Sequence, residues 1–248
     1  MKVEIDPKYF EYASEIEAIP ASYENLKVSK VFCNNRNNVL LIKIGPHDCV
    51  LKRYKRPIFI NRIIYSFIRP DKAKRAYKYA KRLLQMGIST PYPVAYMATY
   101  SRGLFDMGYF ISEYSPYQQL YQTDSLSAAQ KEELYRAFAN FTAELHKKGI
   151  CHPDYNPGNI LWNRDSEGKF RFMLVDINRV RFGVCPLRSY LKGMAEEHLP
   201  ANLIPDYCRI MGYDLAKAQS LIKKRRHHNL MKKRIKAFFR GKKRTLLF

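Results

Sequence analysis

The chain has 248 residues, of which 46% are hydrophobic and 14% aromatic, and this composition excludes an intrinsically disordered protein because it can bury a substantial core. Its 44 Lys and Arg residues outnumber the 22 Asp and Glu residues, which gives a formal net charge of +22. A charge this large exceeds what solubility requires, so we expect an anionic partner such as a membrane, a nucleic acid or a phosphorylated glycan.

The N-terminal residues and the cysteines indicate the cellular compartment in which we expect the protein. The N-terminal residues carry acidic side chains where a signal peptide has an apolar core, and no stretch reaches the roughly 18 apolar residues of a membrane span. We therefore expect a cytoplasmic protein that meets a membrane as a peripheral protein. The five cysteines include no Cys-x-x-Cys pair, so we expect reduced thiols and neither a disulfide nor a zinc site.

The first regular elements expected along the chain are strands. Residues 26–56 alternate apolar and polar side chains around two turn-forming segments, 34–38 and 45–48. This pattern predicts three antiparallel strands joined by tight turns. Lys52 falls in the third strand, on a mostly apolar face, because side chains on a strand alternate with a period of two.

A helix and two more strands are expected next. Residues 71–86 repeat apolar side chains at helical spacing, and Gly87 follows as the expected stop signal. Two further strands are expected near 93–100 and 107–114. The N-terminal part of the chain is therefore predicted to be a five-stranded antiparallel sheet with one main helix.

The second half of the chain reads as mostly helical. The polar and aromatic segment 115–125 marks a predicted boundary between an N-terminal lobe, residues 1–114, and a C-terminal lobe, residues 115–248. A long helix is expected to begin at Ser127, which has capping-box spacing, and to end at Gly149. Further helices are predicted at the C-terminal end.

The segment after this helix carries the clearest chemical pattern. Residues 152–159 read His-Pro-Asp-Tyr-Asn-Pro-Gly-Asn, and an apolar strand then leads to Asp176. Phosphoryl transfer needs a carboxylate that orients and deprotonates the attacking hydroxyl, together with oxygen ligands for magnesium. Asp154, Asn159 and Asp176 supply that set, so we predict a phosphotransferase that uses ATP and Mg²⁺. A polar hairpin with incidental Asp and Asn residues is the alternative.

These residues resemble the protein-kinase-like superfamily, whose catalytic loop carries Asp and Asn five residues apart. More narrowly, the chain looks like the bacterial 3-deoxy-octulosonic acid (Kdo) kinase and lipopolysaccharide core heptose kinase family. The likeness spans about residues 25–195 and is carried by 50–54, 87–93, the Asp154 loop and 175–179. It implies an α+β, two-lobe kinase-like fold, with a small antiparallel sheet and one main helix in the N-lobe and a mostly helical C-lobe.

The resemblance also implies roles for individual residues. Lys52 would pair with the nucleotide phosphates and assist catalysis, and Asp154 would be the catalytic base. Asn159 and Asp176 would bind magnesium. The nucleotide would lie between the two lobes.

Two more pairs of residues are expected to bind the adenine and the acceptor. The backbone near Glu113 and Tyr114 would meet the adenine of ATP. Arg179 and Arg181 lie just beyond the metal-binding Asp, where a guanidinium can hold the carboxylate or phosphate of an acidic sugar. Pairing of these arginines with local acids is the alternative.

The chain departs from the protein-kinase pattern in three ways. The glycine-rich loop is absent, and residues 34–38, whose backbone amides can still cover a phosphate, stand in its place. Ala76 occupies the position where RIO kinases carry the glutamate that pairs with the strand lysine, so Lys52 needs another partner. Residues 176–179 read Asp-Ile-Asn-Arg and not Asp-Phe-Gly, and no later Ala-Pro-Glu follows. These departures favour a small or glycan acceptor over a protein substrate.

The basic residues gather in two segments. Residues 52–82 contain twelve Lys or Arg and one acid, and residues 221–248 contain twelve Lys or Arg and no acid. The second segment has the composition of a basic amphipathic helix on an anionic membrane. A helix whose first half packs on the C-terminal lobe is the alternative. No recognition module for nucleic acid is present, so we expect no specific nucleic-acid partner.

The sequence leaves the hydroxyl that is phosphorylated and the oligomeric state open. Together these features predict an ATP- and Mg²⁺-dependent kinase that phosphorylates Kdo or heptose of the lipopolysaccharide inner core at the cytoplasmic face of the inner membrane. Its partners would be the lipopolysaccharide core or lipid A precursor and the anionic membrane surface. A membrane-associated pseudokinase scaffold and an aminoglycoside-type or RIO-like phosphotransferase are the alternatives.

Overall fold

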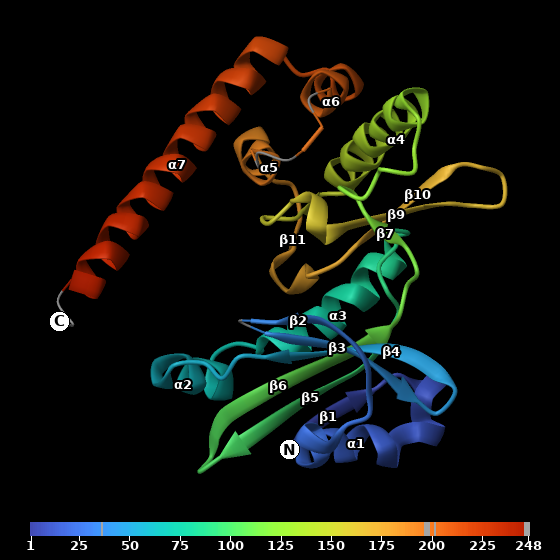
Figure 1. Cartoon of the computed structure of the whole chain (residues 1–248), viewed down its shortest axis with the longest axis vertical. Helices are drawn as coiled ribbons and strands as arrows, with labels where there is room; N and C mark the ends of the chain where they lie inside the picture. The colour runs from blue at the N-terminus through green and yellow to red at the C-terminus, as the bar shows by residue number, and fades with distance from the viewer. Residues whose placement is uncertain (36, 196–198, 201, 246–248) are drawn as a thin grey trace. The chain divides into compact units, whose positions relative to one another are not determined.

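The computed structural model describes residues 1–35, 37–195, 199–200 and 202–245 (Figure 1). They form two compact units, one made of Met1–Tyr117 with Met173–Arg179 and the other of Gln118–Phe172 with Val180–Phe248. The division into lobes at residues 114 and 115 stays a prediction, because a compact unit is not by itself a functional lobe. The elements in chain order are β1 (Lys2–Ile5), η1 (Pro7–Tyr12), α1 (Ala13–Ser22), η2 (Tyr23–Asn25), β2 (Val28–Asn34), β3 (Asn38–Ile44), β4 (His47–Tyr54), α2 (Phe59–Phe67), α3 (Lys72–Gln85), β5 (Pro93–Ser101), β6 (Leu104–Glu113), β7 (Gln118–Gln119), α4 (Ala128–Lys147), β8 (Ile150–Cys151), η3 (Pro157–Asn159), β9 (Ile160–Arg164), β10 (Phe170–Leu174), η4 (Ile177–Arg179), β11 (Arg181–Phe182), α5 (Leu187–Gly193), α6 (Leu203–Met211) and α7 (Leu215–Thr245).

The first unit is built on an antiparallel sheet with the strand order β1-β5-β6-β4-β3-β2 (Figure 1). The five predicted strands are present, but the expected number was wrong because the sheet has six strands. The additional strand, β1, pairs with residues 95–98 of β5. No local turn joins these two strands, so the sequence around β1 gives no hairpin signal. In the turn between β2 and β3, Arg36 lies outside the described residues.

The predicted helix of the first unit is α3. The Asp71 carboxylate caps it by accepting the backbone N–H groups of Ala73 at 2.8 Å and Lys74 at 3.2 Å. Gly87 follows with a φ of 72°, as expected of a residue that ends a helix. Two helices, α1 and α2, were not predicted. A proline at position 20 lies inside α1, and the apolar residues of α2 do not face the core.

The segment Met173–Arg179 is tied to the loop that follows α3. The Leu174 N–H donates to the Ser89 carbonyl at 3.0 Å, and the Thr90 hydroxyl donates to the Leu174 carbonyl at 2.7 Å. Helix α3 also packs against η4. Asp176 lies two residues after the end of β10, so these contacts hold it in the first unit.

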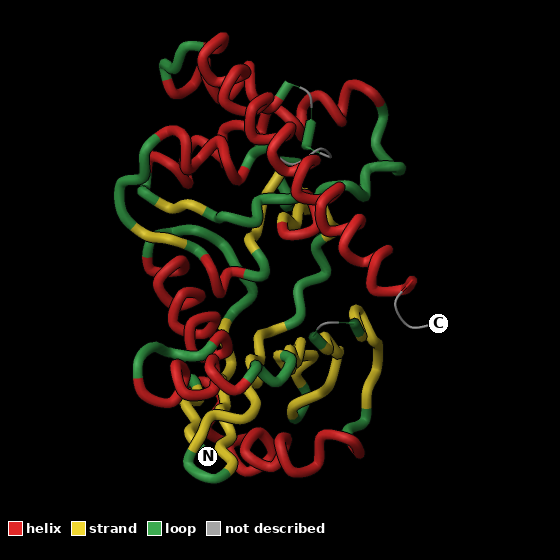
Figure 2. The backbone as a smooth tube through the Cα atoms, turned by 90° about the vertical axis from the view of Figure 1, so that its left-hand side faces the viewer, coloured by secondary structure: helices red, strands yellow, loops and turns green. Residues whose placement is uncertain are grey.

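The second unit is mostly helical, with short strands (Figure 2). Its long helix, α4, begins with the predicted capping box between Ser127 and Gln130 and packs against α6. Gly149 follows with a φ of 69°, and its carbonyl accepts the Gly183 N–H at 2.9 Å. A Cβ at Gly149 would lie 3.0 Å from the Gly183 backbone, so a glycine suits this close approach.

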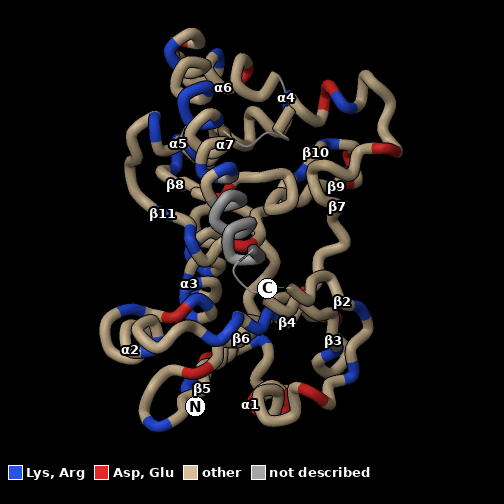
Figure 3. The backbone as a smooth tube through the Cα atoms, turned by 60° about the vertical axis from the view of Figure 1, so that its left-hand side comes forward, with Lys and Arg blue, Asp and Glu red and all other residues tan. Residues whose placement is uncertain are grey.

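Helix α7 has two different halves. Ala218 and Ile222 are buried, and the helix contacts α5 and α6, so its first half packs on the second unit. Leu230, Met231 and Ile235 are exposed. Lys and Arg residues recur along the same helix (Figure 3). The side chains from residue 236 onward lie outside the described residues. Among the described residues, no helix combines the length and the apolar character needed to span a bilayer.

We predict that the α3 cap contributes measurably to stability. Asp71→Ala removes the acceptor of two backbone N–H groups and should lower the free energy of unfolding by about 0.5–2 kcal/mol. Asp71→Asn keeps an acceptor oxygen and should retain most of that stability. Denaturant unfolding of the two variants measures the difference, and equal losses would contradict the capping role.

His146 lies in the core of the second unit. Its Nδ1 lies 2.9 Å from the Tyr207 hydroxyl, and its ring stacks on Tyr190 with 3.9 Å between ring centroids. Burial lowers the pKa of His146 from 6.5 to about 3. The histidine is therefore neutral in the folded protein over the whole physiological range.

We predict that His146 makes the protein less stable in acid. Because its pKa is lower in the folded state, the unfolded chain binds the extra proton, and stability falls as the pH drops from about 6.5 toward 3. At pH 5 the loss relative to pH 8 should be about 2 kcal/mol. His146→Gln should reduce this pH dependence in denaturant unfolding, whereas replacing the exposed His227 should not. An unchanged pH dependence in His146→Gln would contradict this role.

Candidate active site

In the first unit, Lys52 forms an ion pair with Asp176. Lys52 lies on β4 between Val39 of β3 and Phe110 of β6, and its side chain is only 16% exposed. Its ammonium group meets the Asp176 carboxylate. Ala76 is buried on α3, so the acidic partner of the strand lysine is this aspartate and not a helix glutamate.

The backbone and a neighbouring amide fix Asp176. The residue has a φ of 54°, in the left-handed region that residues other than glycine rarely adopt. The Asn178 amide donates to the same carboxylate oxygen, Oδ1, at 2.7 Å. The local strain and the two donors together orient the carboxylate. The role of Asn178 was not predicted; its only signal in the sequence is a polar amide two residues after the aspartate.

A neutral tyrosine lies beside the pair. The Lys52 ammonium lies 5.3 Å from the ring centroid of Tyr54, which is 4% exposed. Burial raises the pKa of the Tyr54 hydroxyl well above its usual value, and the negative charge of Asp176 raises it further. Tyr54 is therefore an uncharged surface beside the ion pair.

Two backbone N–H groups of the predicted adenine-binding segment already donate hydrogen bonds within the protein. The Glu113 N–H donates to the Tyr92 carbonyl at 2.8 Å, and the Tyr114 N–H donates to the Asp48 carbonyl at 2.9 Å. An adenine at this position would therefore have to use the carbonyl groups of these residues or the amides that follow.

The Glu113 side chain makes structural contacts. Its carboxylate accepts the Lys8 ammonium and the Tyr9 hydroxyl, each at 2.6 Å. Burial opposes ionisation of Glu113, but these hydrogen bonds outweigh burial and lower its pKa. The carboxylate thus fastens η1 to the end of β6.

An exposed aromatic pair lies at the same end of the sheet. Phe32 on β2 stacks on Tyr114, with 6.1 Å between ring centroids and 20° between ring planes. The two residues are 43% and 39% exposed. Flat aromatic faces that reach solvent can stack against a planar base. Phe32 was missed from the sequence, where its signal is an aromatic residue on an otherwise exposed strand.

In the second unit, a network of hydrogen bonds shapes the Asp154 loop. The Asn156 amide donates to Asp154 Oδ1 at 3.1 Å, and its own oxygen accepts the Gly158 N–H at 2.9 Å. The Asp154 N–H donates to His152 Nδ1 at 3.2 Å. Asn156 therefore links the carboxylate to the turn, a role that spacing alone did not predict.

Asn159 returns to the same turn. Its Nδ2 donates to the Asp154 carbonyl at 2.9 Å, which brings the two predicted residues together. With the nitrogen used in this way, Oδ1 is the atom of the amide that remains to accept or to coordinate. Amide and carboxylate oxygens are the hard ligands that magnesium prefers, so Asn159 and Asp176 both have the chemistry of magnesium ligands.

Buried aromatic residues pack against the Asp154 loop. Tyr155 is 2% exposed, stacks on Phe138 of α4 at 5.7 Å, and shares a 2.8 Å hydrogen bond with the Thr142 hydroxyl. His152 is likewise 2% exposed. This packing anchors the residues on either side of Asp154, while Asp154 itself stays partly exposed.

The two predicted acceptor-binding arginines are exposed. Arg179 lies in η4 of the first unit. Arg181 lies in β11 of the second unit and is paired in register with Cys151, three residues before Asp154. Within the described part of the chain, neither guanidinium forms an ion pair.

The predicted site residues thus form two local groups, Lys52 with Asp176 in one unit and Asp154 with Asn159 in the other. Their roles in catalysis and binding stay predictions.

Comparison with known proteins assigns the chain to a family. A model of the lipopolysaccharide kinase (Kdo/WaaP) family matches residues 33–190. A search of curated proteins finds no match. Among solved structures, WaaP in complex with acyl carrier protein is similar with a TM-score of 0.62 and 16% identity, over 92% of this chain and 99% of that chain. The ADP/Mg²⁺-phosphoaspartate complex of Rio2 kinase from Chaetomium thermophilum is similar with a TM-score of 0.51 and 15% identity, over 84% of this chain and 66% of that chain.

At these identities the structural likeness shows the fold alone, and it confirms the predicted kinase-like fold. The family match extends over more than half of the chain and confirms the resemblance drawn from the sequence. The chain therefore belongs to the lipopolysaccharide kinase (Kdo/WaaP) family and is a kinase that phosphorylates a sugar hydroxyl.

Proposed function

We propose that this protein transfers the γ-phosphoryl group of ATP, in the presence of Mg²⁺, to a hydroxyl of Kdo or heptose in the lipopolysaccharide inner core. The observation that carries the proposal is the 2.9 Å hydrogen bond from Asn159 to the Asp154 carbonyl. It holds a carboxylate and an amide within one turn, in a chain of the lipopolysaccharide kinase family. These are the groups that a kinase needs to orient its acceptor and to bind metal.

Each residue has a defined task in this reaction. Asp154 orients the sugar hydroxyl and accepts its proton as the new phosphorus–oxygen bond forms and ADP leaves. Lys52 supplies positive charge to the nucleotide phosphates, and Asn159 and Asp176 supply oxygen ligands for the metal. Bound magnesium neutralises phosphate oxygens and so stabilises the charge that develops during transfer.

The adenine contacts follow from the aromatic pair. Phe32 and Tyr114 offer stacked, partly exposed rings, and the backbone carbonyl of Glu113 can accept from the adenine amino group. The Glu113 carboxylate takes no part in this recognition because Lys8 and Tyr9 already bind it.

The acceptor is an acidic glycolipid. Kdo carries a carboxylate and the lipid A precursor carries phosphates, and the exposed Arg179 and Arg181 have the charge and geometry to bind such groups. The exposed Lys and Arg residues of α7 and of residues 52–82 are suited to the anionic inner-membrane surface, where each basic group contributes about 1 kcal/mol (Figure 3). These charges support the proposal that the protein acts at the cytoplasmic face of that membrane.

The function can be tested with purified protein, labelled ATP, magnesium and either Kdo–lipid A or heptose-containing core as acceptor. We expect label in one of these lipids, and Asp154→Asn should lower kcat about 100- to 10,000-fold because the proton acceptor is lost. The matched control is Asp124→Asn, which changes an exposed carboxylate of the same unit. Label in free aminoglycosides or in proteins, with none in lipid, would contradict the proposed acceptor.

Nucleotide binding separates the enzyme from a pseudokinase scaffold. Magnesium-ATP should raise the thermal unfolding temperature of the wild-type protein, and Asp176→Asn and Lys52→Met should abolish most of that shift because they remove a metal ligand or a phosphate-binding charge. Asp48→Asn, which alters the exposed ion pair with Lys43, is the control and should keep the shift. A wild-type protein without any shift at saturating nucleotide would favour the scaffold.

A further inference from the structure

Helix α2 turns its polar side toward the protein. Arg62 Nε donates to the Phe105 carbonyl at 2.7 Å, and the Phe105 N–H donates to the Ser66 hydroxyl at 2.8 Å. The Tyr65 ring meets the Phe105 ring edge-on at 5.4 Å. Arg62, Tyr65 and Ser66 recur at helical spacing, so the helix is attached to β6 through its polar face.

The apolar side of α2 consequently faces outward. Phe59, Ile60 and Phe67 are 65%, 56% and 75% exposed, and the flanking Ile58 and Ile68 are 68% and 74% exposed. No residue of the helix is fully buried. Several strongly exposed apolar residues gathered on one short helix of a folded protein mark an interaction site.

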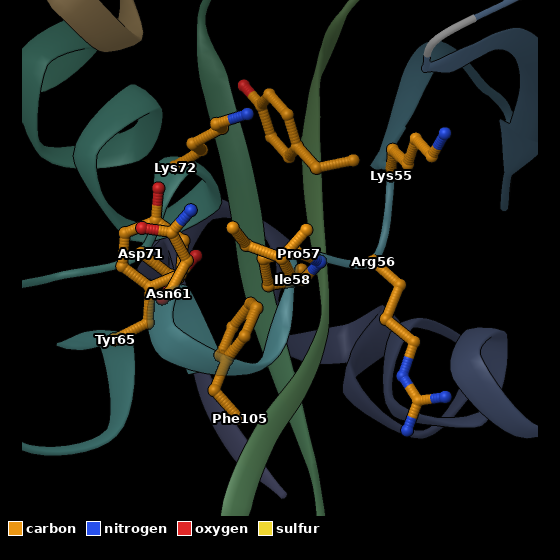
Figure 4. A pocket seen from close by; sticks show the side chains of 11 residues that line it. Lys55, Arg56, Pro57, Ile58, Asn61, Tyr65, Asp71, Lys72 and Phe105 are labelled. Carbon is orange, nitrogen blue, oxygen red and sulfur yellow. The ribbon is translucent and has the colours of Figure 1, made fainter. Parts of the chain in front are cut away.

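A hollow separates the beginning of α2 from the sheet (Figure 4). Its volume is about 430 Å³, and its lining includes Ile58 and Asn61 from the start of the helix, Asp71 and Lys72 from α3, and Phe105 from β6. The N-terminal end of α2 is therefore not part of a tightly packed core.

Most of the charge around α2 is positive, and the nearby acid, Asp106 of β6, is ion-paired with Arg56 at 2.6 Å and with Arg62 at 3.7 Å. Lys55 and Arg56 precede the helix, Arg69 follows it, and all three are exposed. The one acid between residues 52 and 82, Asp71, is only 4% exposed. An apolar face with a basic border is the pattern of a helix that lies in the interface of an anionic bilayer. The same border would repel a second copy of this chain.

We propose that α2 is a lipid-inserting helix, whose exposed Phe59, Ile60 and Phe67 enter an anionic membrane while the adjoining Lys and Arg side chains hold the lipid headgroups. This deepens the proposed function, on which it rests for the choice of membrane. The lipid contact itself requires neither nucleotide nor catalysis. The basic residues beside α2 attract this unit to the surface, and the apolar residues of α2 fix it there.

Vesicle binding tests the insertion directly. Flotation with vesicles of phosphatidylethanolamine and phosphatidylglycerol should show binding of the wild-type full chain, and the double variant Ile60→Ser, Phe67→Ser should bind roughly tenfold or more weakly. The control is Phe10→Ser, since Phe10 is 61% exposed on η1, outside the basic segment. Equal binding by wild type and double variant overturns the proposal.

The depth to which a side chain of α2 enters the bilayer provides a second readout. In Phe59→Trp, fluorescence should shift to shorter wavelength on vesicle addition and be quenched by lipids brominated on their acyl chains. Phe10→Trp should show neither change, and the natural Trp162, at 4% exposed, gives a constant background. Quenching that is absent, or equal at both positions, overturns insertion by α2.

Activity measurements keep this inference separate from the kinase function. Phosphorylation of a deacylated, water-soluble core acceptor should be unchanged in the Ile60→Ser, Phe67→Ser variant, and phosphorylation of the same acceptor in vesicles should fall. Loss of both activities overturns the lipid assignment. If vesicle binding is unchanged but the variant alters the oligomeric state, or alters cross-linking of α2 to the chain's own C-terminal end, the assignment is overturned as well.

Discussion

The ion pair between Lys52 and Asp176 joins two segments that lie 124 residues apart, and much of the first unit serves to hold its two ends. The sheet fixes Lys52 between two strands. The loop after α3 fixes the strand before Asp176 through Ser89 and Thr90. The Asp176 side chain is 36% exposed, so the pair contributes little to folding stability. Its importance is positional, because it keeps a cation and a carboxylate together where water and ligands can reach them.

The second unit holds its loop with hydrogen bonds donated by neutral side-chain amides. Asn156 and Asn159 bind the carboxylate and the carbonyl of Asp154, and buried aromatic residues hold the adjoining backbone. Polar groups that satisfy one another in this way rigidify a loop without a regular element.

Local signals explain which features could be predicted from the sequence. The caps of α3 and α4, the turns of the meander and the Asp–Asn spacing are all encoded within a few residues. The pairing of β1, the stacking of Phe32 on Tyr114 and the partner of Lys52 depend on residues far away in the chain, so no local pattern specified them. The sequence showed from Ala76 that the usual glutamate was missing, but only the fold could show that Asp176 takes its place.

Helix α2 escaped prediction for a different reason. Its sequence has helical periodicity, but the rule that the apolar face meets the core fails, because Arg62, Tyr65 and Ser66 make the contacts to the sheet. Natural sequences obey such rules except where function requires otherwise, so an inverted helix is itself evidence of a partner. The acceptor that we propose is a glycolipid, which is confined to the plane of a membrane, and kinases with soluble acceptors do not face this constraint. An apolar face bordered by positive charge meets that constraint, since charge alone attracts a protein to a membrane while apolar insertion also fixes its orientation there.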